Sequence, residues 1–369
     1  MVEKKHGVML PLVTTLCSPF SPQFSPSRSA RIHRMRMRKA VLTLFGLCTS
    51  MSQALNPPPN ITECNGSAAI CSRKYSNVSL IGTHGSAHIG GIHDWRINQE
   101  RSVTFQLDSG IRFLQAQTHQ HLGKLRMCHT SCWLYDGGTL DDYLTTVKNW
   151  LDAHPNEVVT MLLTNYDRNL PSDFDAVFSS VGLDKLAFVP ASSPKPLSSD
   201  AWPTYAELIT LDSRLVLFLD YKADPSTVPY ILPEFEYFFE TPFNTVNPKF
   251  DQCTLDRGPD GSEGDGLMYI VNHFLDIEVG EDVLNIPDDL LDLVVPDESK
   301  RVLIPDHDSN FATNAATGDG SIGAQAELCK TVWGRWPNVV LVDMFSRGNV
   351  FEAQNRLNGL RSTVVSEVE

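Results

Sequence analysis

The sequence predicts an α/β fold in a single domain, a TIM-type (β/α)₈ barrel that is either regular or distorted and incompletely closed. Apolar, β-branched runs recur along the chain, and most are continuous, which is typical of parallel strands buried on both faces. Helical patterns lie between some of these runs, across a length of about 300 residues that suits such a barrel. A doubly wound open sheet is the alternative, but no G-x-G-x-x-G or P-loop sequence follows the first run.

The elements can be placed in chain order. The predicted strands are residues 78–81, 111–114, 158–163, 215–219, 267–271 and 339–342. The clearest helix covers 139–151, where apolar side chains recur every three or four positions. Thr139 and Asp142 form a capping box at its start. A turn after His154 leads into the next strand, as expected for a strand–helix–strand unit.

The first 54 residues do not resemble part of the fold. Residues 18–34 are rich in Ser, Pro and Arg with no hydrophobic period, and residues 1–34 are interpreted as a gene-model extension or a disordered tail. Residues 35–54 read as a signal peptide, with basic residues, then an apolar run, then small residues at a cleavage site. The run is shorter than the roughly 20 residues that span a bilayer, so no transmembrane segment is expected. Residues 55–369 are the predicted barrel domain of a secreted protein.

The charge excludes some partners. The chain has a formal net charge of −14, and residues 1–54 hold eight of its 30 Lys and Arg but one of its 44 Asp and Glu. The remaining chain is therefore still more acidic. Such a surface argues against nucleic acid as a partner and against electrostatic docking on anionic lipid. It leaves open insertion at a membrane through a few apolar side chains.

The cysteines and the glycosylation sequons fit an oxidising compartment. Six cysteines remain after the leader, an even number that predicts disulfides. Six cysteines allow 15 connectivities. Sequence proximity favours the pairs Cys64–Cys71, Cys128–Cys132 and Cys253–Cys329. Three N-x-Ser/Thr sequons predict glycosylation at Asn60, Asn65 and Asn77.

Polar residues follow or end several of the runs, where parallel strands of a barrel bring their chemistry together. These residues are His84, Gln115, Gln117, His129, Asn165, Asp220, His273 and Asp343. His84 and His129 each come directly after an apolar, β-prone run. Cleaving a phosphodiester without a cofactor needs one imidazole to accept a proton from the attacking hydroxyl and another to donate one to the leaving oxygen.

Several of these motifs resemble one family. Ile81-Gly-Thr-His84-Gly-Ser is similar to the start of the X region of phosphatidylinositol-specific phospholipases C, and residues 106–117 resemble its second strand. Cys128-His129 falls where the family has its second histidine, while 157–165 and 337–343 resemble two later strands. The cysteine-bracketed histidine is most similar to secreted fungal PLC-like phosphodiesterases. The resemblance covers residues 64–359.

The resemblance implies an activity and roles. His84 would be the general base, His129 the general acid, and Asp343 the carboxylate that orients an imidazole. The product would be a cyclic phosphate, and the substrate an inositol phospholipid or GPI-like glycolipid at a membrane surface. The implied substrate-binding residues are Gln115, Gln117, Asn165 and His273.

The sequence departs from that family beside the histidines. Position 85 is Gly, where relatives carry Asn or Asp, and Gln115 and Gln117 stand where relatives have charged residues. Glutamines are poor substitutes for the carboxylates that bind Ca²⁺, so no cofactor and no metal are expected. The missing positive charge could come from Lys124, Arg126 or protonated His119.

Three alternatives remain open. His119 and His121 with Cys128 and Cys132 have the residue types of a zinc site, although a disulfide between the cysteines is favoured in a secreted chain. The barrel could be a catalytically inactive binding or cell-wall protein, as Gly85 and the glutamines suggest. It could also be a metal-dependent glycerophosphodiesterase or sphingomyelinase D-like hydrolase, whose expected Glu/Asp pair the sequence lacks.

Overall fold

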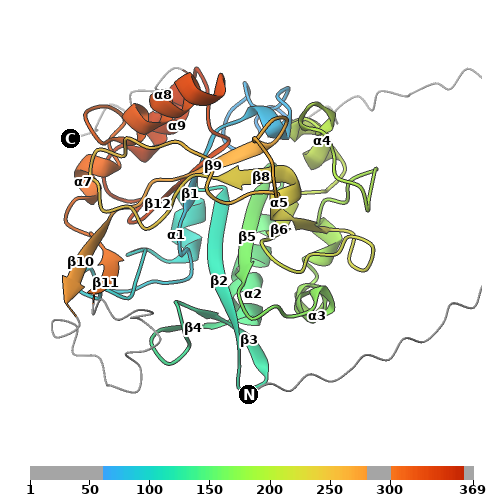
Figure 1. Ribbon diagram of the computed structural model, residues 1–369. Helices are drawn as coiled ribbons and strands as arrows, with labels where there is room; N and C mark the ends of the chain where they lie inside the picture. Colours follow the sequence, from blue (N-terminus) through green and yellow to red (C-terminus); the bar gives the residue numbers. More distant parts are fainter. Residues whose placement is uncertain (1–60, 281–300, 361–369) are drawn as a thin grey trace, which may run out of the picture. The chain divides into compact units, whose positions relative to one another are not determined.

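Parallel strands form a curved sheet in the order β7–β6–β5–β2–β1–β12–β9–β8 (Figure 1). Its strands are β1 (Leu80–Thr83), β2 (Phe113–His121), β5 (Val159–Asn165), β6 (Leu215–Leu219), β7 (Ile231–Pro233), β8 (Phe238–Glu240), β9 (Met268–Asn272) and β12 (Val339–Val342). The computed structural model describes residues 61–280 and 301–360, which belong to one domain. Among these residues every step of the order is a parallel pairing, and no ladder joins β7 to β8. The predicted barrel is therefore confirmed, in its incompletely closed form.

Helices connect and flank the strands. They are α1 (Val103–Asp108), α2 (Leu140–Ala153), α3 (Pro171–Val181), α4 (Tyr205–Thr210), α5 (Glu234–Tyr237), α7 (Asn310–Thr313), α8 (Ile322–Trp333) and α9 (Val350–Leu357). The hydroxyl of Thr139 caps α2 by accepting a hydrogen bond from the Asp142 backbone N–H, as the capping box predicts. α5 alone separates β7 from β8, so it lies at the gap in the ring.

The strands alternate between two hydrophobic clusters. Leu80 belongs to an inner cluster and Ile81 to an outer one, which also contains the buried faces of α2, α3, α8 and α9. Phe113 and Leu114 of β2 repeat this alternation. Successive side chains of a strand point to opposite faces, and both faces here are apolar. This explains why the runs in the sequence are continuous.

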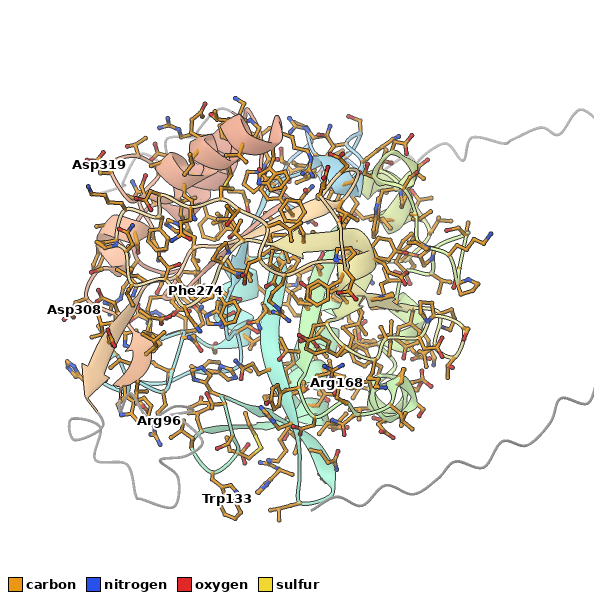
Figure 2. The ribbon with its side chains drawn as sticks, in the orientation of Figure 1. Arg96, Trp133, Arg168, Phe274, Asp308 and Asp319 are labelled. Carbon is orange, nitrogen blue, oxygen red and sulfur yellow. A yellow bond between two sulfur atoms is a disulfide. The ribbon has the colours of Figure 1, made fainter. Side chains whose placement is uncertain are left out.

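An antiparallel hairpin extends the sheet at the carboxyl ends of the strands. β2 continues beyond the barrel and pairs with β3 (Lys124–Cys128), which pairs with β4 (Asp136–Thr139). Trp133 lies in the loop between β3 and β4 and protrudes into solvent, with 71% of its surface exposed (Figure 2). A second antiparallel pair, β10 (Asp276–Gly280) and β11 (Arg301–Pro305), follows β9. The hairpin places residues 128–135 beside the mouth of the barrel.

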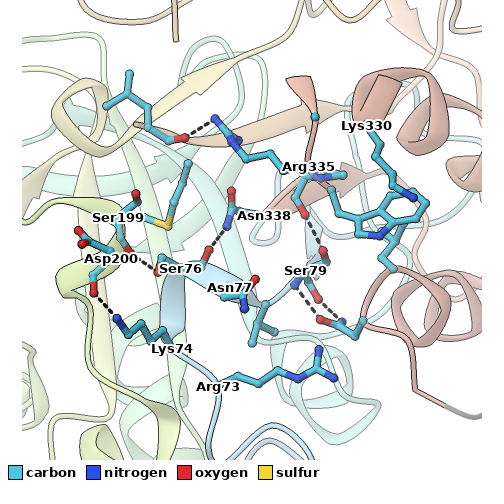
Figure 3. A pocket seen from close by; sticks show the side chains of 18 of the residues that line it. Arg73, Lys74, Ser76, Asn77, Ser79, Ser199, Asp200, Lys330, Arg335 and Asn338 are labelled. Atoms are coloured by element: carbon cyan, nitrogen blue, oxygen red, sulfur yellow. Dashed lines mark hydrogen bonds between the residues drawn. The ribbon is translucent and has the colours of Figure 1, made fainter. Parts of the chain in front are cut away.

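A cavity of about 600 Å³ lies at the opposite, N-terminal end of the barrel (Figure 3). Its basic residues are Arg73, Lys74, Lys330 and Arg335. Several of them are held by the protein itself: Lys74 donates to the Asp200 carbonyl, and Arg335 to the Leu267 carbonyl. The cavity contains none of the predicted catalytic residues, which lie at the other end of the strands.

Candidate active site

The alternation of the strands places four predicted site residues on the inner face of the barrel mouth. His84 follows β1 in step with Leu80, and Asp343 follows β12 in step with Leu341, both of which belong to the inner cluster. Gln115 and Gln117 continue the inner face of β2. Parallel strands end at the same edge, so these residues meet there although they are far apart in sequence.

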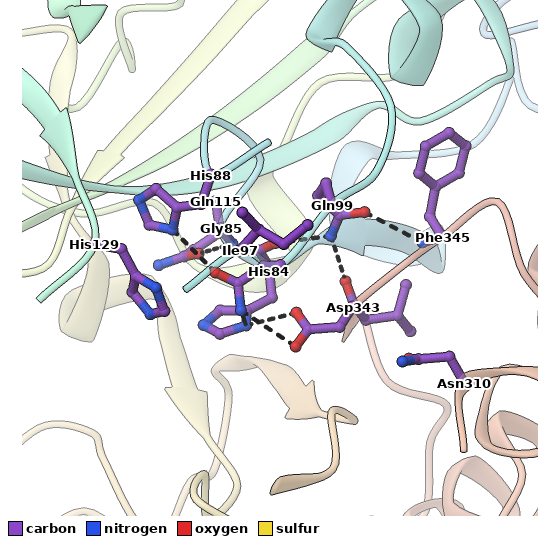
Figure 4. Close-up of polar contacts among 12 residues, drawn as sticks. His84, Gly85, His88, Ile97, Gln99, Gln115, His129, Asn310, Asp343 and Phe345 are labelled. Carbon is purple, nitrogen blue, oxygen red and sulfur yellow. Dashed lines mark hydrogen bonds and ion pairs between the residues drawn. The ribbon is translucent and has the colours of Figure 1, made fainter. Parts of the chain in front are cut away.

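His84 is held from several sides (Figure 4). Its Nδ1 lies 2.9 Å from Oδ1 of Asp343, which is buried. Its ring stacks on Phe274 with 3.8 Å between the ring centroids. The Gln99 side-chain amide donates to the His84 carbonyl at 2.8 Å and to the Val342 carbonyl at 3.0 Å, which ties the ends of β1 and β12 together. The carboxylate accepts the Nδ1 proton, so Nε2 is the nitrogen left to act as a base.

His129 lies in the loop after β3. Its Nδ1 donates to the Arg96 carbonyl at 2.7 Å, which leaves Nε2 for chemistry. Its ring stacks on His88 at 4.6 Å. The pKa of His129 is lowered to about 4, chiefly by burial and also by the nearby charge of His84, while the hydrogen bond to the Arg96 carbonyl opposes the shift. This coupling and Figure 4 place the two histidines at one site.

Both glutamines are anchored through their side-chain oxygens. Gln115 Oε1 accepts the Gly85 backbone N–H at 2.8 Å, and Gln117 Oε1 accepts the Thr130 backbone N–H at 3.0 Å. A backbone N–H can only donate, so these contacts fix the orientation of each amide. The groups left for a ligand are then the two Nε2 donors. Donors suit a phosphoryl oxygen and do not suit a cation.

The residues proposed for a zinc site are engaged otherwise. Cys128 and Cys132 form a disulfide, His119 Nδ1 lies 3.1 Å from Asp167, and the His121 ring packs edge-on against Trp133 at 5.0 Å. In residues 61–280 and 301–360, no group of three or more His, Cys, Asp or Glu is placed to hold a metal ion. The donor set at this position therefore does not fit zinc.

The three residues proposed to supply positive charge, Lys124, Arg126 and His119, are also engaged elsewhere or exposed. Arg126 Nε donates to Asp136 at 2.8 Å, and His119 lies beside Asp167, so both face a carboxylate. Lys124 is exposed in the β2–β3 hairpin. Within the described residues none of them hydrogen-bonds to His84 or His129, although the charge of His119 helps to lower the pKa of His129.

Asp220 lies in a charged cluster at the carboxyl ends of β6 and β8, together with Arg257 and Glu240, which the sequence did not predict. Arg257 Nη1 donates to Glu240 at 3.1 Å and Nη2 to Asp220 at 3.4 Å. Burial raises the pKa of Asp220 to about 6 and that of Glu234 well above its usual range, where Glu240 adds to the rise. Phe218 and Phe238 belong to the inner cluster. Since side chains alternate along a strand, Asp220 and Glu240, two positions later, are expected to point into the barrel as well.

Asn165 and His273 occupy the other face of their strands. Asn165 is in step with Leu163 of the outer cluster, and its Nδ2 donates to the carbonyls of Asn169 and Tyr221. His273 is in step with Val271, and its nitrogens contact Gln325 Oε1 at 2.6 Å and the Thr313 carbonyl at 2.8 Å. The structure brings neither side chain to the candidate histidines His84 and His129.

The cysteines pair as sequence proximity favours. The disulfides are Cys64–Cys71, Cys128–Cys132 and Cys253–Cys329. Asn77 is exposed, whereas the Asn65 amide donates to and accepts from the Val158 backbone. Residues 1–54 and Asn60 lie outside the described residues. None of the described helices is long and apolar enough to cross a bilayer.

Two further residues lie beside the His84–Asp343 pair. Asn98 donates to Asp343 Oδ2 at 3.2 Å, and Asp276 is a buried carboxyl whose pKa rises to about 7 through burial and the charge of Asp343. Neither follows an apolar run of the kind that predicted the other residues. Asp276 lies two residues after Phe274, which stacks on His84, so only the fold reveals its place.

Comparisons with known proteins agree with these features. The model of the family described as PI-PLC X 1 matches residues 70–358. A PI-PLC X domain-containing protein 1 of Arthroderma benhamiae is 46% identical over 299 residues, covering 80% of this chain and 90% of that protein. An uncharacterized secreted protein of the same fungus is 36% identical over 327 residues, covering 86% of this chain and 69% of that protein.

Solved structures with detectable similarity have low sequence identity. The phosphatidylinositol-specific phospholipase C of Listeria monocytogenes is 14% identical, covers 79% of this chain and 96% of its own, and has a TM-score of 0.44. A mutant of the Staphylococcus aureus enzyme is 13% identical, covers 79% of this chain and 95% of its own, and has a TM-score of 0.45.

Proposed function

This chain belongs to the PI-PLC X domain family, and from that premise we propose that it is a secreted phosphoric diester hydrolase. The proposed substrate is an inositol phospholipid or a GPI-like glycolipid, cleaved through a cyclic phosphate. One observation carries the proposal: His84 and His129 share the barrel mouth, and each has its Nδ1 bound by the protein and its Nε2 left for chemistry.

The geometry supports a two-step proton transfer. His84 Nε2 removes the proton from the substrate hydroxyl next to the phosphate, and that oxygen forms a new bond to phosphorus. The bond from phosphorus to the lipid alcohol breaks, and His129 donates a proton to the leaving oxygen. His129 must carry a proton for this step, and the negative charge of a bound phosphodiester would raise its pKa from about 4 toward the working range.

Charge stabilisation at phosphorus is assigned to amide donors. Gln115 and Gln117 have their Oε1 atoms bound to backbone N–H groups, so their Nε2 groups could donate to a phosphoryl oxygen. One such donor typically contributes about 10²- to 10³-fold to the rate. We propose no metal in this step, because Gln115 and Gln117 are neutral and each Oε1 already accepts a backbone N–H, a poor substitute for the carboxylates that bind Ca²⁺.

Secretion and contact with a membrane surface belong to the same proposal. Three disulfides fit an oxidising compartment, as does the predicted signal peptide. Trp133 and Leu122, exposed by 71% and 85%, lie on the hairpin loops beside the mouth, and Tyr166 follows β5 at the same end. Such side chains could enter a lipid surface without basic residues.

A second candidate function is a binding protein that has lost catalysis. It is favoured by the ion pairs of Arg126 and His119, which leave little positive charge for a phosphate beside the histidines. In that case the mouth of the barrel would bind the lipid head group without turning it over.

One experiment separates these functions. The full chain, secreted from an expression host, is incubated with phosphatidylinositol vesicles with and without EDTA, and ³¹P NMR follows the cyclic phosphate. Release that survives EDTA and is lost in His84→Ala and His129→Ala supports the proposal, with the exposed His93→Ala as control. Turnover that persists in both variants, or that EDTA abolishes, contradicts the proposal. Binding to the vesicles without turnover would favour the second candidate.

A further inference from the structure

Gly85 has no room for a side chain, although it directly follows the catalytic His84. Its φ is +53°, in the left-handed region that favours glycine. A Cβ added there would overlap Oδ1 of Asn98 and would lie 2.6 Å from its Cγ. The space that a side chain at position 85 would use is therefore filled by Asn98, which arrives from a loop 13 residues later.

Asn98 is buried, and both its side-chain amide and its backbone form hydrogen bonds. Its Oδ1 lies 3.0 Å from His88 Nδ1, and its Nδ2 donates to Asp343 Oδ2 at 3.2 Å. Its backbone N–H donates to the His88 carbonyl at 3.0 Å, and its carbonyl accepts from Met344 at 2.8 Å. These backbone bonds fix the residue between the two segments that its side chain joins.

The direction of these bonds follows from the Asp343 carboxylate, which can only accept, so Asn98 turns Nδ2 toward Asp343 and Oδ1 toward His88. Burial holds the pKa of His88 well below its usual value, so this imidazole is neutral and carries one proton. With that proton on Nδ1, it donates to Asn98 Oδ1 at 3.0 Å. The Asn98 amide then presents Nδ2 to the carboxylate. The proton order is thus His88 to Asn98, Asn98 to Asp343, and His84 to Asp343.

This chain of bonds reaches both catalytic histidines. At one end the Asp343 carboxylate orients His84. At the other end the His88 ring stacks on His129 with an interplanar angle of 17°. Asp343 is buried, so removal of Asn98 would leave one of its oxygens without that partner in a place that water reaches poorly.

We propose that Asn98 is a positioning residue that takes the place of a side chain at position 85 and holds the His84–Asp343 and His88–His129 pairs in one buried network. The inference rests on the proposed function of the two histidines. It predicts that positions 85 and 98 are coupled, because they compete for one space.

The first test uses charge. Asn98→Asp keeps the shape but replaces the donor with a second carboxylate facing Asp343. We expect the pKa of His84, followed by NMR of its ring Cε1–H, to rise by about one to three pH units. The base-dependent limb of the kcat/KM profile should move to higher pH by the same amount. Asn355→Asp in α9 adds the same charge away from the site and should leave the His84 titration unchanged.

The second test uses space. Gly85→Asn and Asn98→Gly should each lower the thermal midpoint and turnover, since one creates an overlap and the other removes the donor. Asn tolerates the left-handed region best among residues with a side chain, so it is the choice at position 85. The double variant exchanges the two residues and should recover part of both losses. Such recovery would show that side chains at positions 85 and 98 compete for the same space.

The outcomes separate this inference from the proposed function. An unchanged His84 titration in Asn98→Asp, or losses that simply add in the double variant, would overturn the role of Asn98. Both readouts, NMR and thermal midpoint, need no turnover. A wild-type protein without activity would therefore remove the proposed function while the shifted titration and the recovery still established the network.

Discussion

Nδ1 of His84 lies 2.9 Å from Oδ1 of Asp343, although 259 residues separate them in the chain. The strand register explains the contact: β1 and β12 are parallel neighbours, with Thr83 opposite Val342. The two residues that follow must emerge side by side at the same edge of the sheet. The pairing of β1 with β12 therefore brings the two side chains together.

The first prediction concerns Asp343. In Asp343→Asn a neutral amide replaces the carboxylate that accepts the Nδ1 proton. The imidazole is then no longer held in the tautomer that leaves Nε2 as the base. We expect kcat to fall by about 10²- to 10⁴-fold with a smaller change in KM. Steady-state kinetics with a soluble inositol phosphodiester measures both. Retained near-ultraviolet circular dichroism shows that the barrel is intact, and a kcat within a factor of three of wild type would contradict the role.

The second prediction concerns the Gln115 amide. Gln115→Glu keeps the oxygen that accepts the Gly85 N–H and replaces the Nε2 donor with a negatively charged oxygen. We expect kcat/KM to fall by about 10²- to 10³-fold, because the phosphate loses a donor and meets a like charge. Gln120→Glu, at an exposed position of the same strand, is the matched control. Activity that increases in Gln115→Glu when Ca²⁺ is added would instead show that this position supports a metal.

The third prediction concerns pH and Asp276. Burial, aided by the Asp343 charge, raises the pKa of Asp276 from its usual value near 3.8 to about 7. Between these values the folded protein holds a proton that the unfolded chain has lost, so this group's contribution to stability decreases as pH rises from about 4 to 7. Asp276→Asn does not titrate and should stabilise the protein at pH 8 by on the order of 1–4 kcal/mol relative to its effect at pH 4.

Urea unfolding of Asp276→Asn and wild type at both pH values measures this difference. Groups that titrate identically in both proteins cancel in the comparison, including the buried histidines. Asp319→Asn, at an exposed carboxylate, should show the same effect at both pH values. A stabilisation that is equal at pH 4 and pH 8 would show that Asp276 does not have a raised pKa.

Much of the architecture could be predicted from the sequence because continuous apolar runs identify parallel strands, and parallel strands share one functional edge. That reasoning led to the barrel and to His84 and Asp343 at its mouth. It did not distinguish the two faces of each strand. Asn165 and His273 were expected to bind substrate, but both lie at the ends of their strands on the outer face of the barrel. Side chains two positions apart on a strand share a face, so the last apolar residues of each strand indicate which of the polar residues that follow point inward and which point outward.

Asn98 and Asp276 were beyond this kind of reasoning for another reason. Asn98 arrives from a loop and Asp276 begins the short strand β10 outside the barrel, so no periodicity of the barrel strands tells where either side chain will point. Gly85, which follows the candidate base His84, is an indirect signal, since a glycine is needed where another group fills the side-chain space. Only the fold shows that this is Asn98.

The fourth prediction compares two disulfides. Cys253–Cys329 closes a segment of 76 residues and Cys128–Cys132 one of four. In the chain-entropy model these stabilise the fold by about 4–5 and about 2 kcal/mol. Removal of the long-range pair by two Cys→Ala changes should lower the free energy of unfolding more, as urea titration measures. Removal of the short pair should lower kcat more, because His129 follows Cys128. The reverse ranking in kcat would contradict the role of the short loop.

The last prediction concerns Trp133 and Leu122 on the hairpin loops beside the mouth. An apolar side chain of this size that enters the lipid surface contributes about 1.5–3 kcal/mol. Trp133→Ala and Leu122→Asn should each weaken binding to phosphatidylinositol vesicles by about 10- to 100-fold in a sedimentation assay, and asparagine suits the φ of +50° at position 122. Turnover should fall more on vesicles than on a soluble substrate, because only the first requires insertion. Val332→Ala removes an exposed apolar side chain from α8, away from the mouth, and should not change vesicle binding. Equal losses on both substrates would place these residues in head-group binding and would exclude a membrane anchor.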